Sequence, residues 1–153
     1  MRQFHKGQRL IKLCDQQTRT AQQVMSRYVR QQKHLQEEIA RCEAELQTLG
    51  DMILAQQLNN VTTNRAEIYA QRRQQAVLLH QCQQLRIEHM MRTENLHEVE
   101  YEITQCQRQL ATLKRKEMKF TQWTRATKKE WLMQRELCSE NELQEDIPWR
   151  LQS

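Results

Sequence analysis

The chain has 153 residues, of which 38% are hydrophobic, with two glycines, one proline and a formal net charge of +5. Globular domains contain roughly 45–50% apolar residues, so a chain this polar with so few helix breakers is not expected to enclose a thick core. It favours long helices that each bury one narrow stripe. The charge is compatible with nucleic acid or with acidic proteins and establishes neither.

Several classes of protein are disfavoured by the pattern. No stretch approaches the ~20 apolar residues of a membrane span, and the basic N-terminus lacks the apolar region of a secretory signal. Five cysteines at long irregular spacings disfavour a disulfide framework and favour a reducing compartment. There is no glycine-rich phosphate loop and no nucleophile–base set. We therefore expect a cytoplasmic protein that is not an enzyme and holds no cofactor.

The first predicted element is a helix, the arm 8–58, in which seam residues are spaced alternately four and three apart, as in a coiled coil. Two successive steps of four near residue 35 predict a local straightening of the supercoil. A glycine such as Gly50 lowers the stability of a helix by ~1 kcal/mol relative to alanine. The four–three spacing of the seam residues nevertheless continues through Gly50. The predicted seam consists of Leu10, Cys14, Gln17, Ala21, Val24, Tyr28, Gln31, Leu35, Ile39, Cys42, Leu46, Leu49 and Ile53.

The segment 59–64 is predicted to be a hairpin turn, because Asn and Thr side chains compete with the helical backbone. Asn64 and Glu67 have the spacing of a capping box, in which Asn64 accepts from the amide of Glu67. Ile68 and Tyr69 follow at once. They either close the end of the hairpin or form an exposed hydrophobic contact.

The second arm, 65–139, keeps the alternation of four and three over many heptads, which is typical of a left-handed coiled coil. An acidic tail, 140–153, follows, and Pro148 is expected to end any helix. The predicted seam consists of Leu78, Cys82, Leu85, His89, Arg92, Leu96, Val99, Ile103, Cys106, Leu110, Leu113, Glu117, Phe120, Thr124, Thr127, Trp131, Gln134 and Cys138.

These elements predict an all-α fold: one long antiparallel two-helix coiled-coil hairpin, residues 1–153, with a longer C-terminal arm. Folding the arms about the middle of the turn pairs residues whose numbers add to about 123. Everything from Trp123 onward then has no partner in the chain. The expected pairs are Leu35 with His89, Cys42 with Cys82, Leu10 with Leu113, and Met1 with Gln122.

Metal binding is not expected. Every cysteine falls on a predicted seam, where reduced thiols serve as small core residues, and no two cysteines have the short spacing of zinc ligands. Glu94 and His97 form one Glu-x-x-His pair without further ligands. His89 lies on the seam, where a polar side chain can determine the register.

Basic residues and tryptophans surround the end of the second arm, and three interpretations stay open. A docking helix would use aromatic residues and Arg as interface anchors. Nucleic acid would be bound through phosphates and stacking. A solvated basic face with tryptophans packed on a dimer mate is the third. Trp123 lies one step off the seam, on a different face from Trp131, which favours a socket that surrounds the helix.

Two short stretches suggest a family. Asn64-Arg65-Ala66-Glu67-Ile68-Tyr69 at the tip, together with Lys119-Phe120-Thr121-Gln122-Trp123 and the later Gln134-Arg135-Glu136, resembles the central-stalk proteins of type III secretion systems. The closest likeness is to the InvI branch of the YscO/FliJ group. Such proteins resemble the coiled-coil part of the rotary ATPase γ subunit.

The resemblance implies a stalk whose terminal end enters a hexameric secretion ATPase and whose tip faces the cytoplasmic domain of the export gate. It implies a bacterial cytoplasmic protein, peripheral to the secretion apparatus at the inner membrane, with Ile68 and Tyr69 at the gate-proximal tip. Alternatives are an escort for secretion chaperones, a nucleic-acid-binding coiled coil, which is not expected, and a parallel homodimeric scaffold. The residues expected at the ATPase are Phe120, Trp123, Arg125, Lys128, Lys129, Trp131 and Arg135.

Overall fold

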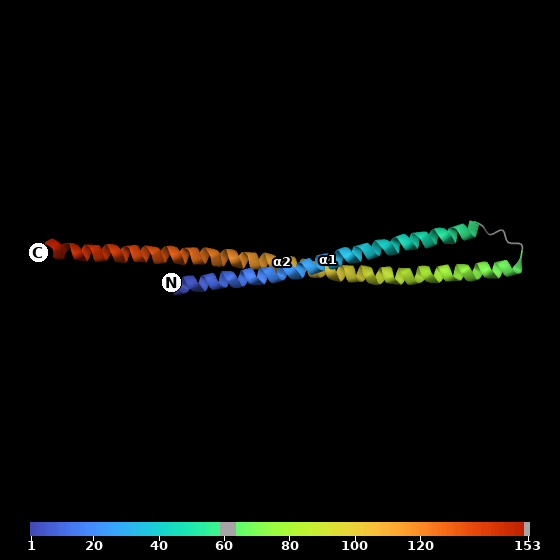
Figure 1. Ribbon diagram of the computed structural model, residues 1–153, viewed down its shortest axis with the longest axis horizontal. Helices are drawn as coiled ribbons and strands as arrows, with labels where there is room; N and C mark the ends of the chain where they lie inside the picture. The colour runs from blue at the N-terminus through green and yellow to red at the C-terminus, as the bar shows by residue number, and fades with distance from the viewer. Residues whose placement is uncertain (59–63, 152–153) are drawn as a thin grey trace. The chain divides into compact units, whose positions relative to one another are not determined.

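The computed structural model describes residues 1–58 and 64–151, and this part of the chain contains two helices and no strand. They are α1 (Arg2–Leu58) and α2 (Arg65–Leu151), shown in Figure 1. The chain divides into two compact units: a terminal unit, Met1–Val24 with Cys106–Ser153, and a tip unit, Met25–Gln105. Within each unit α1 and α2 pack antiparallel, which confirms the predicted all-α helical hairpin.

The helix boundaries differ from the predicted ones. α1 begins at Arg2, earlier than residue 8, and it is continuous through Gly50 as expected. α2 continues through the predicted acidic tail to Leu151, so the expectation that Pro148 ends the helix is wrong. Proline lacks a backbone donor and its ring crowds the carbonyl four residues earlier, but Pro148 lies in the last turn of α2, where this affects only the end of the helix. The predicted turn lies, except for Asn64, outside the described residues.

Asn64 caps the start of α2. Its Oδ1 accepts a hydrogen bond of 3.4 Å from the amide of Ala66, and its carbonyl accepts one of 3.2 Å from the amide of Ile68. The predicted cap is therefore present, but the bonded amide belongs to Ala66 and not to Glu67. A side-chain acceptor at this position satisfies one of the amides that a helix start leaves without an intrahelical partner.

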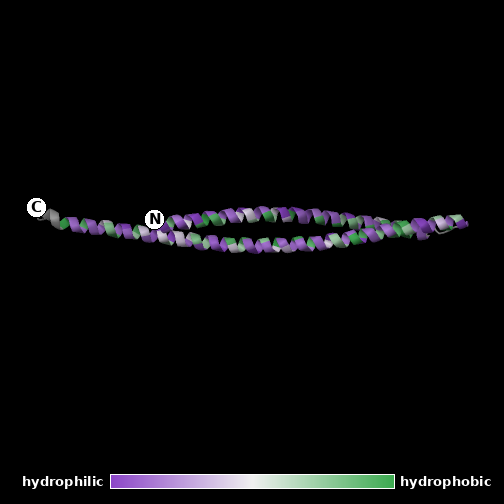
Figure 2. Cartoon of the chain, turned by 90° about the horizontal axis from the view of Figure 1, so that it is seen from below, coloured by the Kyte–Doolittle hydropathy of each residue, from purple (hydrophilic) through white to green (hydrophobic). Residues whose placement is uncertain are grey.

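The seam of each unit follows the predicted spacing. Its buried positions are occupied mainly by small or medium apolar residues, with Thr124 as a buried polar one, and hydrophilic residues predominate along both helices (Figure 2). Gln17 and Gln31 are predicted on the seam and are exposed, because Thr18 and Gln32 take those places. The buried apolar residues are Cys14, Ala21, Cys106 and Leu113 in the terminal unit and Leu35, Cys42, Cys82 and Val99 in the tip unit.

The predicted pairing of the two helices is wrong by about one heptad. The numbers of paired residues add to about 131 and not to about 123, so Leu58 stands opposite about residue 73. Pairs that add to 123 would require the end of α1 and the start of α2 to lie side by side at the turn. In the structure α2 starts beyond the end of α1. The pairs that establish this are His89 with Glu43, Arg92 with Glu38, and Lys128 with Phe4.

The four expected pairs are corrected accordingly. Glu43 takes the place expected for Leu35 opposite His89, and Cys42 lies against Arg92. Cys82 lines a groove with Gly50 and Ile53, and Leu113 lines one with Gln17 and Ala21. Met1 falls opposite about residue 130 and not opposite Gln122. The pairing of α2 with α1 therefore extends past Trp123.

Arg92 makes the polar contacts at the middle of the tip unit. Its Nε lies 3.2 Å from Glu38 Oε2 on α1, and its Nη1 donates to the Cys42 sulfur at 2.6 Å and lies 3.6 Å from Glu88. Desolvation acts to lower the pKa of Arg92, but the adjacent Cys42 sulfur and the carboxylates of Glu38 and Glu88 outweigh it, so this pKa is raised. Arg92 is thus held as a cation against α1.

Gly7 allows a close approach of the two helices in the terminal unit. It is buried, and a Cβ added there would meet Thr124 Oγ1 and would lie 3.1 Å from the Trp123 ring. Thr124 is itself held, because its hydroxyl donates to the Phe120 carbonyl at 2.6 Å. A Cβ added at Gly50 would have nothing within 4 Å.

Gly50→Ala should raise the free energy of unfolding by up to ~1 kcal/mol, which is the difference in helix propensity between the two residues. Gly7→Ala gains the same propensity but forces Thr124 or α1 to move, at a cost of typically ~1–3 kcal/mol. We expect Gly7→Ala to be destabilising by about 1 kcal/mol. Urea denaturation followed by circular dichroism gives both values, and hydrogen exchange over residues 2–14 shows where protection is lost. A Gly7→Ala variant as stable as Gly50→Ala would contradict this packing.

Candidate functional site

The residues expected at the ATPase lie on α2 in the terminal unit, and the structure pairs several of them with α1. Phe120 is half-buried on the seam, and Trp123 is 40% exposed beside Gly7. Lys128 Nζ lies 5.8 Å from the centre of the Phe4 ring, within the range of a cation–π contact. The expectation that the chain is unpaired from Trp123 onward is therefore wrong.

Among the described side chains of α2, Trp131 is the last that the hairpin covers. It is half-buried, and Arg135 Cζ lies 5.4 Å over its ring. Every described side chain from residue 132 to residue 147 is exposed, including Gln134 and Cys138, which are predicted on the seam. The part of α2 after Trp131, residues 132–151, is named the overhang.

The overhang carries apolar residues that the seam analysis missed, because they lie off the seam. At about 100° per residue they fall within one half of the helix, away from the side of Trp131, and Glu136 and Glu140 lie among them. The sequence did contain a signal for this surface, namely a cluster of apolar residues on one side of a helix for which no partner helix was predicted. They are Leu132, Met133, Leu137, Leu143 and Ile147, with 43–64% exposure.

Charge changes sign at the start of the overhang. Residues 114–135 contain eight Lys or Arg and two Glu, whereas residues 136–147 contain five Asp or Glu and no Lys or Arg. Arg125 and Lys129 are exposed, and neither forms an ion pair with another described residue. Their charges are available to a partner because no carboxylate of the described chain neutralises them.

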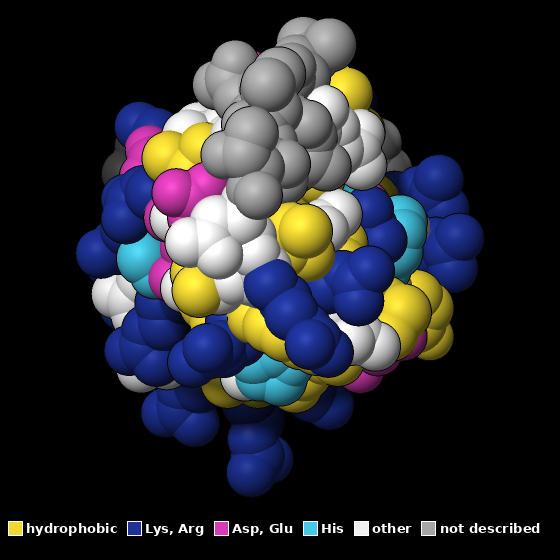
Figure 3. All heavy atoms as spheres, turned by 90° about the vertical axis from the view of Figure 1, so that its right-hand side faces the viewer, with side chains coloured by type: hydrophobic (Ala, Val, Ile, Leu, Met, Phe, Trp, Pro, Cys, Tyr) yellow, Lys and Arg dark blue, Asp and Glu magenta, His cyan; other side chains and the backbone are white. Residues whose placement is uncertain are grey.

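The tip surface consists of Ile68 and Tyr69 on the first turn of α2. They are 39% and 50% exposed, and Arg65 Cζ lies 6.0 Å over the Tyr69 ring. The register of the tip unit places both residues beyond the end of α1. Seen from the tip side, Lys and Arg side chains are interspersed with hydrophobic ones (Figure 3). The apolar side chains of the tip surface therefore have the guanidinium of Arg65 beside them.

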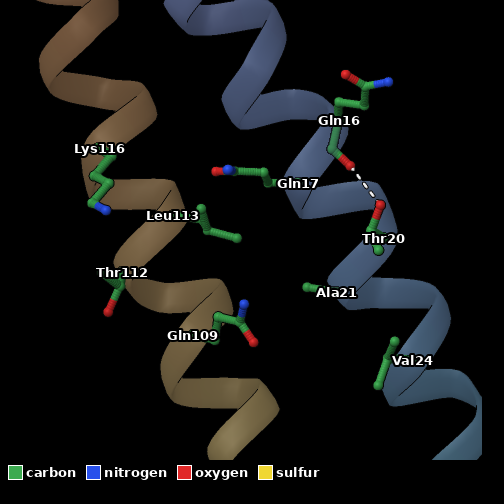
Figure 4. A pocket seen from close by; sticks show the side chains of 9 residues that line it. All are labelled: Gln16, Gln17, Thr20, Ala21, Val24, Gln109, Thr112, Leu113 and Lys116. Carbon is green, nitrogen blue, oxygen red and sulfur yellow. Dashed lines mark hydrogen bonds between the residues drawn. The ribbon is translucent and has the colours of Figure 1, made fainter.

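A groove between the helices of the terminal unit has a volume of about 660 Å³. It forms where Ala21 leaves room on the seam, and Gln17 and Leu113 extend toward each other across it (Figure 4). Amides, hydroxyls, apolar chains and the amine of Lys116 line it, so it offers hydrogen bonds and no acid–base pair. Its lining comprises Gln16, Gln17, Thr20, Ala21, Val24, Gln109, Thr112, Leu113 and Lys116.

Two further properties concern the whole described part of the chain. Within residues 1–58 and 64–151, no group of three or more His, Cys, Asp or Glu is placed to hold a metal ion. Neither α1 nor α2 contains, in its described residues, a segment long and apolar enough to cross a membrane.

The cysteines divide into two classes. Cys14, Cys42, Cys82 and Cys106 are buried as predicted, and all five thiols are free. The expectation that Cys138 is a core residue is wrong, because its seam position lies in the overhang, where α1 does not reach.

Comparison with known protein families gives a match over most of the chain. The model of a family described as Salmonella surface presentation of antigen gene type M protein matches residues 5–147. The match includes most of both helices, the tip surface and the overhang as far as Ile147. No curated protein and no solved structure matches the chain at a significant level.

Native-state labelling with a maleimide should modify Cys138 within minutes and leave the four buried thiols protected. The physical reason is exposure, since a buried thiol reacts only when the helices open. Mass spectrometry of the intact protein should show one added label in buffer and labelling of every thiol in concentrated guanidinium. Rapid labelling of two or more cysteines in buffer would contradict the burial of the four seam cysteines between the helices.

Proposed function

This chain belongs to the family of Salmonella surface presentation of antigen gene type M proteins, which are associated with type III secretion, and from that premise we propose that it is a non-enzymatic central stalk of the secretion ATPase complex. Its terminal end enters the hexameric ATPase, and its tip faces the cytoplasmic domain of the export gate. It acts in the bacterial cytoplasm, peripheral to the secretion apparatus at the inner membrane.

The observation that carries this proposal is the overhang. α2 continues from residue 132 to Leu151, and every side chain described there, from residue 132 to residue 147, is exposed. A single helix with its side chains is about 10–12 Å wide, and a second helix packed beside it adds about 8–10 Å. The overhang therefore fits a pore that the paired helices are too wide to enter.

The exposed side chains on and next to the overhang are of the kinds that bind a protein surface enclosing the helix. Trp123 is partly exposed, and Arg125 and Lys129 are cations without an ion-pair partner among the described residues. Exposed Leu132 and Leu137 continue the surface along the overhang. Aromatic residues and Arg are enriched at the energetic centres of interfaces, and apolar contacts around them exclude water. Phe120, Lys128, Trp131 and Arg135 support this surface through their packing against α1 or along α2.

The tip surface is assigned to the export gate. Ile68 and Tyr69 are exposed beyond the end of α1, where a partner can reach both. A second role as an escort for secretion chaperones draws on the same exposed residues, which offer an apolar contact with Arg65 beside it. Pull-down with the gate domain and with chaperone–substrate complexes separates these two partners.

Two double variants test the assignment of the ends. Arg125→Glu with Lys129→Glu reverses two unpaired charges and should weaken ATPase binding at least tenfold in Kd, about 1.4 kcal/mol, with gate binding unchanged. Ile68→Gln with Tyr69→Gln removes the apolar tip surface and should do the opposite. Fluorescence anisotropy titrations against each partner at the same salt concentration measure both constants.

Each variant is the control for the other, since both leave the seam intact and should retain the helical circular dichroism spectrum. ATPase affinity that is unaffected by the charge reversals would reject the terminal assignment. Equal losses toward both partners in either variant would show a general defect and would contradict separate ends.

A further inference from the structure

The seams of the tip unit do not by themselves select one pairing of the helices. On α2 the covered residues repeat every seven positions from Gln75 to Ile103, and on α1 they do so from Tyr28 to Gln56. When both helices carry the same seven-residue repeat, a slide of one heptad brings equivalent seam positions together again. The apolar contacts alone therefore leave two pairings of similar quality.

These two pairings differ in where α2 starts. In the observed pairing, residue numbers add to about 131, so α2 extends past Leu58 by about two turns. In the alternative, called the lower pairing, the numbers of paired residues add to about 124, which is seven less. Leu58, at the end of α1, and Arg65, at the start of α2, then lie side by side. The six residues between them, at up to about 3.5 Å each, are long enough to join the helix ends in either case.

Polar contacts select the observed pairing. Arg92 reaches Glu38 at 3.2 Å and Cys42 at 2.6 Å, and His89 lies 3.0 Å from Glu43. These are contacts between the two helices, and they join one short stretch of α1 to one turn of α2. A polar or charged residue on a seam is a known means of specifying register.

The lower pairing takes Arg92 away from its carboxylate on α1. Residue 32 would then lie opposite Arg92, and Gln31, seven residues before Glu38, would take the place that Glu38 has now. His89 would lie opposite Leu35 and lose the Glu43 carboxylate. Charge, and not apolar packing, therefore separates the two pairings in free energy.

We propose that Arg92 and His89 form a register lock, and that its opening lets α2 slide by one heptad along α1 to the pairing in which the helix ends are level. The displacement is about 10 Å. It moves Ile68 and Tyr69 from beyond the end of α1 to positions opposite residues 56 and 55. The lock thus controls exposure of Ile68, which shares the heptad position of the covered residues Cys82 and His89, whereas Tyr69 shares that of the exposed Gln83 and Met90. Its role in gate binding depends on the proposed function, whereas the slide itself does not.

The same slide changes the terminal unit. There α2 keeps its seven-residue repeat from Leu110 to Trp131, and the slide would bring Glu117 opposite Gly7 in place of Thr124. Glutamate is larger than threonine and charged, so this contact also favours the observed pairing.

Native cysteines report the slide. In the observed pairing Cys42 lies against Arg92, while Cys82 lines a groove with Gly50. In the lower pairing Cys82 takes the place that His89 has now and lies opposite Cys42. A disulfide requires Cα atoms within about 7 Å, so an intramolecular Cys42–Cys82 bond forms only after the slide.

The experiment uses the full chain, oxidised with copper phenanthroline at low protein concentration. The monomer band of a non-reducing gel is digested and the Cys42–Cys82 peptide pair is quantified by mass spectrometry. Arg92→Leu removes the lock and should raise the yield of this pair at least tenfold over the wild-type chain. Arg86→Leu is the matched control, because Arg86 lines the neighbouring groove and should leave the yield unchanged.

A second variant and a second reporter guard against loss of folding. Glu38→Arg places like charge against Arg92 and should raise the same yield, with helical circular dichroism retained. The double variant Gly50→Cys with Cys42→Ser reports the observed pairing through a disulfide between the thiol introduced at position 50 and Cys82. Arg92→Leu should diminish the yield of that disulfide.

Unchanged Cys42–Cys82 yields in both Arg92→Leu and Glu38→Arg would overturn the lock, as would an equal rise in Arg86→Leu. Gate binding is not involved, so the failure of this test is distinct from failure of the proposed function.

Discussion

The pairing between the two helices depends on the Arg92 guanidinium. It lies on the seam with Glu38 and the Cys42 sulfur of α1 on one side and Glu88 of its own helix on another. A heptad repeat buries apolar surface equally well at every seven-residue step, so it specifies that the helices pair but not at which step. A charge that needs an opposite charge across the seam separates the observed step from the lower one, because the lower step puts Gln31 in the place of Glu38 and leaves Arg92 without that partner.

Both candidate surfaces follow from this offset. Because paired numbers add to about 131, α2 starts beyond Leu58, and Ile68 and Tyr69 stand free of α1. In the terminal unit the pairing of Gly7 with Trp123 and Thr124 extends the covered part of α2. The overhang begins only after Trp131. A helix that is longer than its partner at each end presents two distinct surfaces, which is what a protein joining two partners requires.

Much of this arrangement is predictable from spacing. The predicted seam of α2 is correct from Leu78 to Trp131, because four–three spacing over many heptads has few other physical explanations. Gln17 and Gln31 are misplaced, since glutamine gives no hydropathy signal to distinguish adjacent positions. The offset is not predictable from the turn, because it depends on where Arg92 finds a carboxylate across the seam. The family resemblance is confirmed by the match over residues 5–147.

If the proposed function is correct, the overhang enters the secretion ATPase while the tip surface remains outside it. A photo-crosslinking residue placed at Leu137 in the full chain, mixed with the hexameric ATPase and irradiated, tests this most directly. We expect crosslinks from position 137 to ATPase subunits, mapped by mass spectrometry to the pore, and none from the same probe at Tyr69. ATPase crosslinks from position 69 with none from position 137 would contradict the proposed orientation.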